Sequence, residues 1–345
     1  MTMGPLAGLT AVEFAGLGPA PFAAMTLSDM GVDVLRITRP NAQGPHAGHR
    51  TFLDRGRTTE PIDLTTRDGV EEAKARVRTA DILIEGFRPG VMEKLGLGPE
   101  PMLQANPRLV YGRMTGYGQT GPLAAKAGHD INFLALSGVL GLLGPSDRPP
   151  SPPLNLVADF GGGGMYLAFG IVCAAFEAAR SGRGQVVDAA MIHGVTHLST
   201  FVHAQMARGR WTPGREANLL DGGAPFYRAY ETKDGRYYAV WAVEPKFFEA
   251  LLDVLGLRGD FGEIQLARSR WPEMREAFAR VFRTKTRDEW DAIFADADAC
   301  CTPVLSVEEA FAHPQMRGAT RMEDGVRQPT AAPVFGRTAP RLGPQ

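Results

Sequence analysis

The stretch LTAVEFAGLGPAPFAAMTLSDMGVDVLRIT, residues 9–38, contains the pattern that decides the fold. Two short runs rich in apolar and β-branched residues, 9–15 and 32–38, flank a segment with helical apolar spacing. Glycine and proline between the first run and that segment mark a tight turn. Because parallel strands need a crossover connection, usually a helix, this order predicts the first strand–helix–strand unit of a parallel sheet.

The same alternation continues along the chain. A polar loop follows residue 38, after which residues 67–80 have the pattern of a helix, and 81–87 and 109–115 have that of buried strands. Residues 159–182 predict a long buried helix that ends at Gly182, followed by a strand at 184–191 and a helix through His197. We therefore expect an α/β large domain over residues 1–200.

The pattern changes after about residue 205. Aromatic and β-branched residues on both sides of Asp234-Gly235 predict a hairpin, and helical segments follow it at 244–257, 271–282 and 286–294. These elements predict a smaller α+β domain over residues 225–314, joined through a linker at 201–224. The tail from 315 to 345, rich in Pro, Arg and Gly, is expected to wrap over another surface or to fray.

The composition bounds the kind of partner. The chain has 345 residues, with 37 Lys plus Arg against 38 Asp plus Glu, a balance that argues against a nucleic-acid or membrane surface. Only three cysteines occur, two of them adjacent, so no disulfide framework is implied. No targeting segment is evident, and the longest apolar run, roughly 165–176, is too short to span a bilayer. We expect a cytoplasmic protein with a small-molecule ligand.

The first turn only half matches a dinucleotide-binding fingerprint. Gly16 and Gly18 fit, but Pro21 replaces the third glycine, and arginines rather than a carboxylate follow the second strand. A turn with proline at the start of a helix accounts for the glycines. Arg39 is a phosphate-binding candidate, since a guanidinium beyond a strand end can bind phosphate through two hydrogen bonds; an exposed solubilising arginine is an equal alternative.

Two further glycine-containing segments follow predicted strands or open helices. Gly86-Phe87-Arg88 places a second arginine at the same edge, beside a ring that could stack on a base. The glycines 161–164 lack the Lys-Ser/Thr of a P-loop and indicate close approach of backbone or ligand. Asp159, just before them, is either a helix N-cap or an acid/base group.

Histidines supply the remaining candidates. His193 and His197 have helical metal-ligand spacing, but Gly194 stands where zinc proteases have glutamate, so a packed or surface pair is favoured and no metal is expected. His129 and Asp130 lie at a predicted helix N-terminus, where the Asp130 N–H can stabilise a developing negative charge. With Asp159, this set suits a reaction that removes a proton beside a carbonyl and returns one.

At these residues the chain resembles the family III CoA-transferases and, within them, the α-methylacyl-CoA racemases. The resemblance implies a Rossmann-like large domain that includes the returning tail, a smaller domain, and two chains interlocked as a homodimer. It also implies an active site between the large domain of one chain and the small domain of the other. The segments that carry it are GPLAGLTAVEFAGLGPAPFAAM, DVLRITRP, ADILIEGFRPGVMEKLGLGPE, MTGYGQTGP, AGHDIN, PPLNLVADFGGGGM, GQVVDAAM, LDGGAPFYRAYETKDGRY and TPVL.

The resemblance also implies roles for individual residues. The two bases fall on His129 and Asp159, and the glutamate that pairs with the histidine falls on Glu244. Lys94 departs from an expected arginine, and Phe87 stands where tyrosine is common. The positions implied to contact CoA are Arg39, Ile62, Asp63, Leu64, Thr65, Gly86, Phe87, Arg88, Lys94, Gly128, His129, Asp130, Ile131, Asn132 and Phe133.

The implied activity is the interconversion of (2R)- and (2S)-2-methylacyl-CoA thioesters through an enolate. The alternative is a CoA-transferase in which Asp159 attacks the thioester and forms an anhydride; His129 with Glu244 favours the racemase, because a transferase needs no opposed base. An inactive acyl-CoA-binding protein and an NADP oxidoreductase fit the residues less well. No metal or redox cofactor is implied, since CoA is part of the substrate, and the expected partners are the thioester and a second copy of the chain.

Overall fold

The computed structural model describes residues 4–40, 52–323 and 325–341, and the chain divides into two compact units. The large unit draws on Met1–Val139, Pro153–Thr200 and Gln315–Gln345, and the small unit on Leu140–Pro152 and Phe201–Pro314. The segments 140–152 and 201–224, which we expected in the large domain and in a linker, therefore belong to the small unit. In chain order, the small unit consists of two segments, each inserted into the sequence of the large unit.

A six-stranded, wholly parallel sheet forms the centre of the large unit, as predicted. Its strand order is β3-β2-β1-β4-β5-β6, the order typical of a Rossmann-like fold. Each of the pairs β1–β2 and β5–β6 is in register over five residue pairs. The strands are β1 (Thr10–Phe14), β2 (Asp33–Thr38), β3 (Arg57–Pro61), β4 (Ile82–Glu85), β5 (Val110–Thr115) and β6 (Val186–Ala190).

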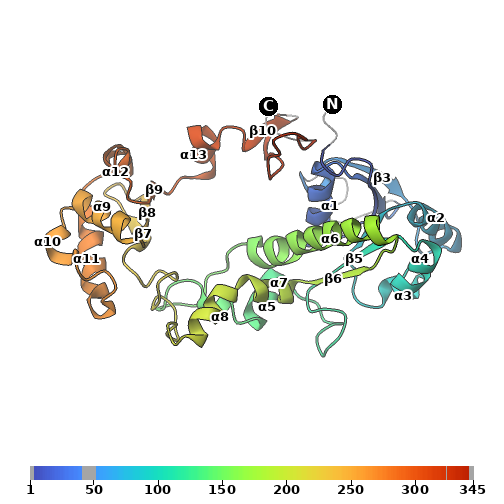
Figure 1. The fold of residues 1–345 in the computed structure, drawn as a ribbon, viewed down its shortest axis with the longest axis horizontal. Helices are drawn as coiled ribbons and strands as arrows, with labels where there is room; N and C mark the ends of the chain where they lie inside the picture. Colours follow the sequence, from blue (N-terminus) through green and yellow to red (C-terminus); the bar gives the residue numbers. More distant parts are fainter. Residues whose placement is uncertain (1–3, 41–51, 324, 342–345) are drawn as a thin grey trace. The chain divides into compact units, whose positions relative to one another are not determined.

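Helices cover both faces of this sheet (Figure 1). On one face α2 and α4 pack over a core that includes Val12, Leu83 and Tyr111. On the other, α1 and α6 lie side by side and α6 packs on β5. The helices of the large unit are α1 (Pro19–Asp29), α2 (Arg67–Arg78), α3 (Val91–Lys94), α4 (Pro99–Ala105), α5 (Asp130–Leu136), α6 (Tyr166–Ser181) and α7 (Met191–Leu198). The next helix, α8 (Thr200–Ala207), begins at the boundary and belongs to the small unit.

One strand lies in the segment that the sequence predicted to be a polar loop. β3 has the sequence RTTEP and pairs in parallel with β2 at the edge of the sheet. A polar sequence that ends in proline is typical of an edge strand, because its outer side faces solvent and needs no apolar alternation. The expectation of a loop throughout residues 39–66 was therefore wrong for 57–61, while residues 41–51 lie outside the described part of the chain.

The helix predicted at 159–182 is longer and less buried than expected. A π-helix, η3 (Leu156–Met165), leads directly into α6, and together they form a 26-residue helical segment long and apolar enough to span a membrane. The expectation that this apolar run is too short for a bilayer was therefore wrong. One face, with Leu167 and Ile171, is fully buried in the large unit, but Phe169 and Phe176 are 69 % and 67 % exposed.

The small unit contains the antiparallel sheet β7-β8-β9, with the predicted hairpin between its first two strands. Its helices enclose a separate core rich in aromatic side chains, among them Phe248, Phe278 and Trp290. This unit is α+β, as predicted. Its strands are β7 (Tyr227–Glu231), β8 (Tyr237–Trp241) and β9 (Cys301–Pro303), and its helices after α8 are α9 (Pro245–Leu255), α10 (Arg258–Phe261), α11 (Trp271–Phe282), α12 (Arg287–Phe294) and α13 (Val307–Ala312).

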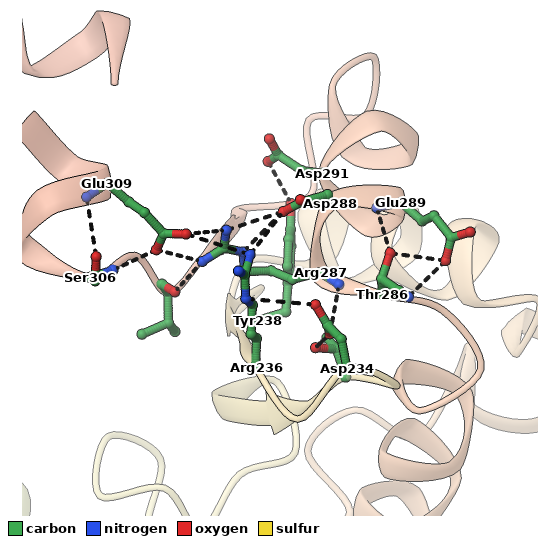
Figure 2. A network of polar contacts seen from close by, with 12 residues as sticks. Asp234, Arg236, Tyr238, Thr286, Arg287, Asp288, Glu289, Asp291, Ser306 and Glu309 are labelled. Carbon is green, nitrogen blue, oxygen red and sulfur yellow. Dashed lines mark hydrogen bonds and ion pairs between the residues drawn. The ribbon is translucent and has the colours of Figure 1, made fainter. Parts of the chain in front are cut away.

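A network of ion pairs ties α13 to the rest of the small unit (Figure 2). The Arg287 guanidinium, whose side chain is 7 % exposed, donates to both carboxylate oxygens of Glu309 at 2.8 Å. Asp288 accepts from the same guanidinium, and Asp234 accepts the Arg287 backbone N–H at 3.1 Å. Arg287 thus links α12 to the hairpin turn through its backbone N–H and to α13 through its buried guanidinium, so loss of the side chain removes the link to α13.

The tail folds back on the large unit, where β10 (Thr320–Glu323) and β11 (Val326–Pro329) form a two-stranded hairpin. Arg55 donates to the Pro329 carbonyl oxygen at 2.7 Å and to the Asp29 carboxylate at 3.0 Å. Arg341 donates its backbone N–H to the Asp29 carbonyl oxygen at 2.8 Å. The tail is therefore anchored to the C-terminal end of α1.

Candidate active site

The positions implied to bind CoA lie along one edge of the parallel sheet. Arg39 follows β2, the 62–65 segment follows β3, and the 86–88 turn follows β4. The 128–133 segment, beyond β5, forms the start of α5. The carboxyl ends of parallel strands form the ligand-binding edge in folds of this type, so the large unit brings these segments to the expected place.

The turns after β2 and β3 contain both exposed side chains, which can contact a ligand, and buried side chains, which cannot. Arg39 is exposed, whereas Arg36 forms an ion pair with Asp54 and is not free for phosphate. Ile62 is 2 % exposed, so its side chain belongs to the core. Asp63 accepts from the backbone N–H and hydroxyl of Thr65 at 3.0 and 2.6 Å, and these bonds lower the pKa of its carboxyl.

The turn after β4 is packed against the core on one side. The ring of Phe87 meets that of Phe14 edge to face, with centroids 6.5 Å apart, so the core already contacts the ring that we expected to stack on a base. A Cβ on Gly86 would lie 3.1 Å from the Ala20 side chain, so the turn packs tightly against α1. Arg88 and Lys94 are exposed and can reach an anionic ligand.

His129 is the N-cap residue of α5, and its side chain is exposed. Its backbone N–H donates to the Asn132 side-chain oxygen at 3.0 Å, so this side chain holds the helix start. Phe133 is buried, and its ring lies so close to Gly128 that a Cβ there would be 2.7 Å away. Both Asn132 and Phe133 therefore shape the segment that presents the histidine.

Asp159 lies within the π-helix, three residues after its first residue, Leu156, so the N-cap interpretation was wrong. The backbone N–H groups of Ala158 and Asp159 both donate to Asp130 Oδ2 at 2.8 Å. Asp130 is the first residue of α5 and is 7 % exposed. Its carboxylate therefore joins the helix start that carries His129 to the turn that carries Asp159.

The surroundings of Asp159 raise the pKa of its carboxyl. Burial is the largest cause, and the nearby negative charge of Asp130 adds to it. A hydrogen bond from the Asn155 side chain and the electrostatic influence of His129 act in the opposite direction. A carboxyl with a raised pKa holds its proton more readily than an ordinary aspartate, which suits a group that gives and takes protons in catalysis.

The glycine run 161–164 lets backbones approach each other. A Cβ on Gly162 would lie 2.8 Å from the Val195 backbone nitrogen, and one on Gly164 would lie 2.9 Å from the Pro19 carbonyl oxygen. The π-helix thus fits tightly between α1 and α7. At the start of α1, Gly18 has a φ of +71°, and a Cβ there would stand 3.6 Å from Asp159 Oδ2.

The remaining candidates are outside the hydrogen bonds that join these segments. Glu244 is the exposed N-cap residue of α9 in the small unit. His197 forms a short hydrogen bond with the Tyr166 hydroxyl, and His193 is exposed, in agreement with a packed or surface pair. The cysteines, Cys173, Cys300 and Cys301, are free thiols.

Comparison with known proteins adds to this geometry. Residues 6–343 match CoA-transferase family III, which is nearly the whole chain. The chain belongs to CoA-transferase family III.

Relatives of this family III chain include both racemases and transferases. It is 48 % identical to the alpha-methylacyl-CoA racemase of Mus musculus over 96 % of this chain and 87 % of that protein, and 47 % identical to that of Homo sapiens over 89 % and 80 %. An acetyl-CoA:oxalate CoA-transferase from Acetobacter aceti is 31 % identical over 90 % and 84 %. A CAIB/BAIF family protein from Brucella suis superposes with a TM-score of 0.82 at 27 % identity, covering 99 % of this chain and 95 % of that chain.

Two features of this family III chain escaped the sequence inference. Asn155, which hydrogen-bonds to Asp159, stands four residues before it, a helical spacing that could have drawn attention to the pair. Glu85, fully buried at the end of β4, was taken as part of an ordinary strand. A glutamate inside an apolar run is rarely buried without a partner, and that is the signal that could have identified it.

Proposed function

We propose that this protein interconverts the two enantiomers of a 2-methylacyl-CoA thioester by 1,1-proton transfer. The observation that carries the proposal is the joining of His129 and Asp159 through the Asp130 carboxylate, with a raised pKa at Asp159. Identity of 47–48 % to alpha-methylacyl-CoA racemases supports the same activity.

In the proposed reaction the two bases act on opposite sides of the α-carbon. One accepts the proton and the C–H electron pair moves into the thioester carbonyl to form an enolate; the other then donates its proton to the opposite face. Removal on one face and return on the other inverts the centre. The pair must hold one proton between them, so their titrations are coupled.

The backbone supplies the stabilisation of the enolate oxygen. Asp130 is the first residue of α5, and N–H groups of a first helical turn have no acceptor within their own helix. The Asp130 N–H, aided by the helix dipole, would stabilise the oxyanion. Glu244 would orient the imidazole of His129 and stabilise its cation; in the proposed dimer it would come from the other chain. The mechanism needs no metal or redox cofactor.

The CoA moiety would bind along the carboxyl edge of the sheet. The exposed cations Arg39, Arg88 and Lys94 would neutralise its phosphates, and the backbone around Gly86 and Gly128 would approach it closely. The side chains of Ile62 and Phe133 are buried and would act through their backbones. Asp63, Leu64 and Thr65 form the turn beside this edge.

A labelling experiment tests the activity. A single enantiomer of a 2-methylacyl-CoA, incubated with the protein in deuterium oxide without any acceptor acid, is expected to give both enantiomers with deuterium at C2. The opposite result would be transfer of CoA to an added carboxylic acid, with no deuterium at C2 when that acid is left out. It would support the CoA-transferase in which Asp159 forms an anhydride. His129→Ala is expected to abolish nearly all racemisation while leaving CoA affinity unchanged; an active variant would remove His129 from the mechanism.

We also propose that two copies of the chain associate. Phe169, Val172 and Phe176 lie on one exposed stripe of α6 at helical spacing, an apolar surface that a monomer would leave in water. Light scattering of the purified protein is expected to give the mass of a dimer. The double variant Phe169→Glu, Phe176→Glu is expected to weaken the association of the two copies. A wild-type protein that is monomeric at micromolar concentration would contradict the proposal.

A further inference from the structure

A buried carboxylate that the proposed reaction does not use lies directly beneath the CoA-binding edge. Glu85, the last residue of β4, is 1 % exposed. Its Oε2 accepts the backbone N–H of Phe87 at 2.8 Å, and its Oε1 accepts Arg113 Nε at 2.9 Å. The first bond fixes the turn that follows the strand.

The bond from Arg113 to Glu85 links the turn after β4 to helix α3. Arg113 stands opposite Glu85 in the register of β4 and β5, and its side chain is 9 % exposed. Its Nη1 lies 2.8 Å from Glu93 Oε1, on the helix residue that precedes Lys94. Three linked side chains therefore run from the turn with Arg88 to the short helix with Lys94.

Stability alone does not account for this arrangement. The desolvation cost of a buried ion pair offsets much of its attraction, so apolar side chains of similar volume commonly give equal or greater stability. What the pair supplies is geometry: a fixed direction for the Phe87 N–H and a fixed place for Glu93. α3 has only four residues, too few for its own hydrogen bonds to hold it in one orientation.

We propose that Glu85, with Arg113, is a positioning residue for CoA binding. The inference rests on the proposed function. The pair holds the 86–88 turn and α3 so that Arg88 and Lys94 meet the same ligand, and it does so without contact to the reacting carbon. Its loss therefore acts on the binding of CoA and not on the proton transfer.

Glu85→Gln tests the role, because it keeps the shape and removes the charge opposite Arg113. We expect KM for the thioester, and the Kd of free CoA measured by titration calorimetry, to rise about tenfold, the loss of roughly one charged hydrogen bond. kcat is expected to stay within about twofold, since uniform binding alone is lost. Amide hydrogen exchange in the 86–95 peptide is expected to accelerate, because the Phe87 N–H loses a charged acceptor.

Two further variants separate positioning from general destabilisation. Asp29→Asn breaks a comparably buried ion pair, with Arg55, at the C-terminal end of α1. That variant is expected to lower the stability of the protein without changing the Kd of CoA. The double variant Glu85→Gln, Arg113→Met leaves no buried charge unpaired and is expected to fold if the single variant does not. Its CoA affinity is expected to fall as in the single variant.

Each outcome decides one question. If the wild-type protein binds no CoA, the proposed function fails and the inference fails with it. If wild-type CoA binding is normal and the folded Glu85 variants bind CoA with unchanged affinity, the inference alone is overturned. A fall in kcat with unchanged KM would also overturn it, because that pattern assigns Glu85 to the chemical step.

Discussion

Replacement of Gly194 by alanine probes the contact that holds the helix of Asp159. Gly194 is buried in α7 and faces Gly162 of the π-helix. A Cβ at position 194 would stand 1.8 Å from the Gly162 carbonyl oxygen, whereas real Cβ atoms essentially never come within 3.0 Å of another atom. The obstacle is backbone on both sides, so no side-chain rotation relieves it.

The expected losses of stability and activity follow from the overlap between this Cβ and the Gly162 carbonyl oxygen. The two helices must separate by more than about 1 Å, and overpacking of this kind costs about 1–3 kcal/mol, against which better helix propensity returns about 1 kcal/mol. Asp159 stands three residues before Gly162 in the same π-helix, so it moves with Gly162. Misplacement of a catalytic group by about 1 Å can lower the rate about 100-fold. We therefore expect a modest loss of stability and a large loss of racemisation.

Denaturant unfolding and deuterium incorporation at C2 measure the two effects separately. Gly259→Ala is the matched control, because Gly259 lies in α10 with open space around its missing Cβ and has no positive φ. That variant is expected to be as stable as the wild-type protein and fully active. A Gly194→Ala protein with wild-type activity would refute the argument that the π-helix is held in place by this contact.

Two further predictions concern pH. Arg287 is the main cause that lowers the pKa of Glu309, to about 2 from an ordinary 4.5, so the stability that this pair contributes is present above about pH 4.5 and is lost as the pH falls toward 2. All four tryptophans lie in the small unit, so their fluorescence should report this acid loss, and Glu309→Gln should remove it; an unchanged acid transition in the variant would contradict the assignment. Burial and then Asp130 raise the pKa of Asp159, so in the direction that uses Asp159 as the base, activity should fall with decreasing pH at a higher pH than for an ordinary aspartate. Asp130→Asn should shift that limb of the kcat/KM profile to lower pH, and an unshifted limb would show that the charge of Asp130 does not act on Asp159.

Much of the fold could be predicted because the large unit obeys local rules. Parallel strands such as β4 and β5 are buried along their whole length and mostly apolar, and the helices between them have regular caps and periodicity. β3 escaped because the pairing of an edge strand is decided by its neighbour rather than by its own apolar residues. The same limit applies to segment 140–152, whose place in the small unit depends on contacts such as that of Arg215 with the Pro145 carbonyl oxygen.

The candidate site could be predicted only in part, for a similar reason. His129 and Asp159 were identified by residue type and resemblance, but the bond that joins their helices runs through a side chain 29 positions away from Asp159. The π-helix has no periodicity signal that distinguishes it from an α-helix over ten residues. The ring of Phe87, in the turn after β4, packs on Phe14 of β1, a contact between distant parts of the sequence that no local pattern encodes.

The anchored tail has a consequence for how the protein is made. Arg55 and Asp29 find partners in Pro329 and Arg341, which are synthesised roughly 300 residues later. A nascent chain can therefore assemble all six parallel strands while the Arg55 guanidinium and the Asp29 backbone carbonyl still lack these tail partners. A premature stop codon just after the small unit would release a product that keeps every residue proposed for chemistry and yet remains a target for quality-control proteases.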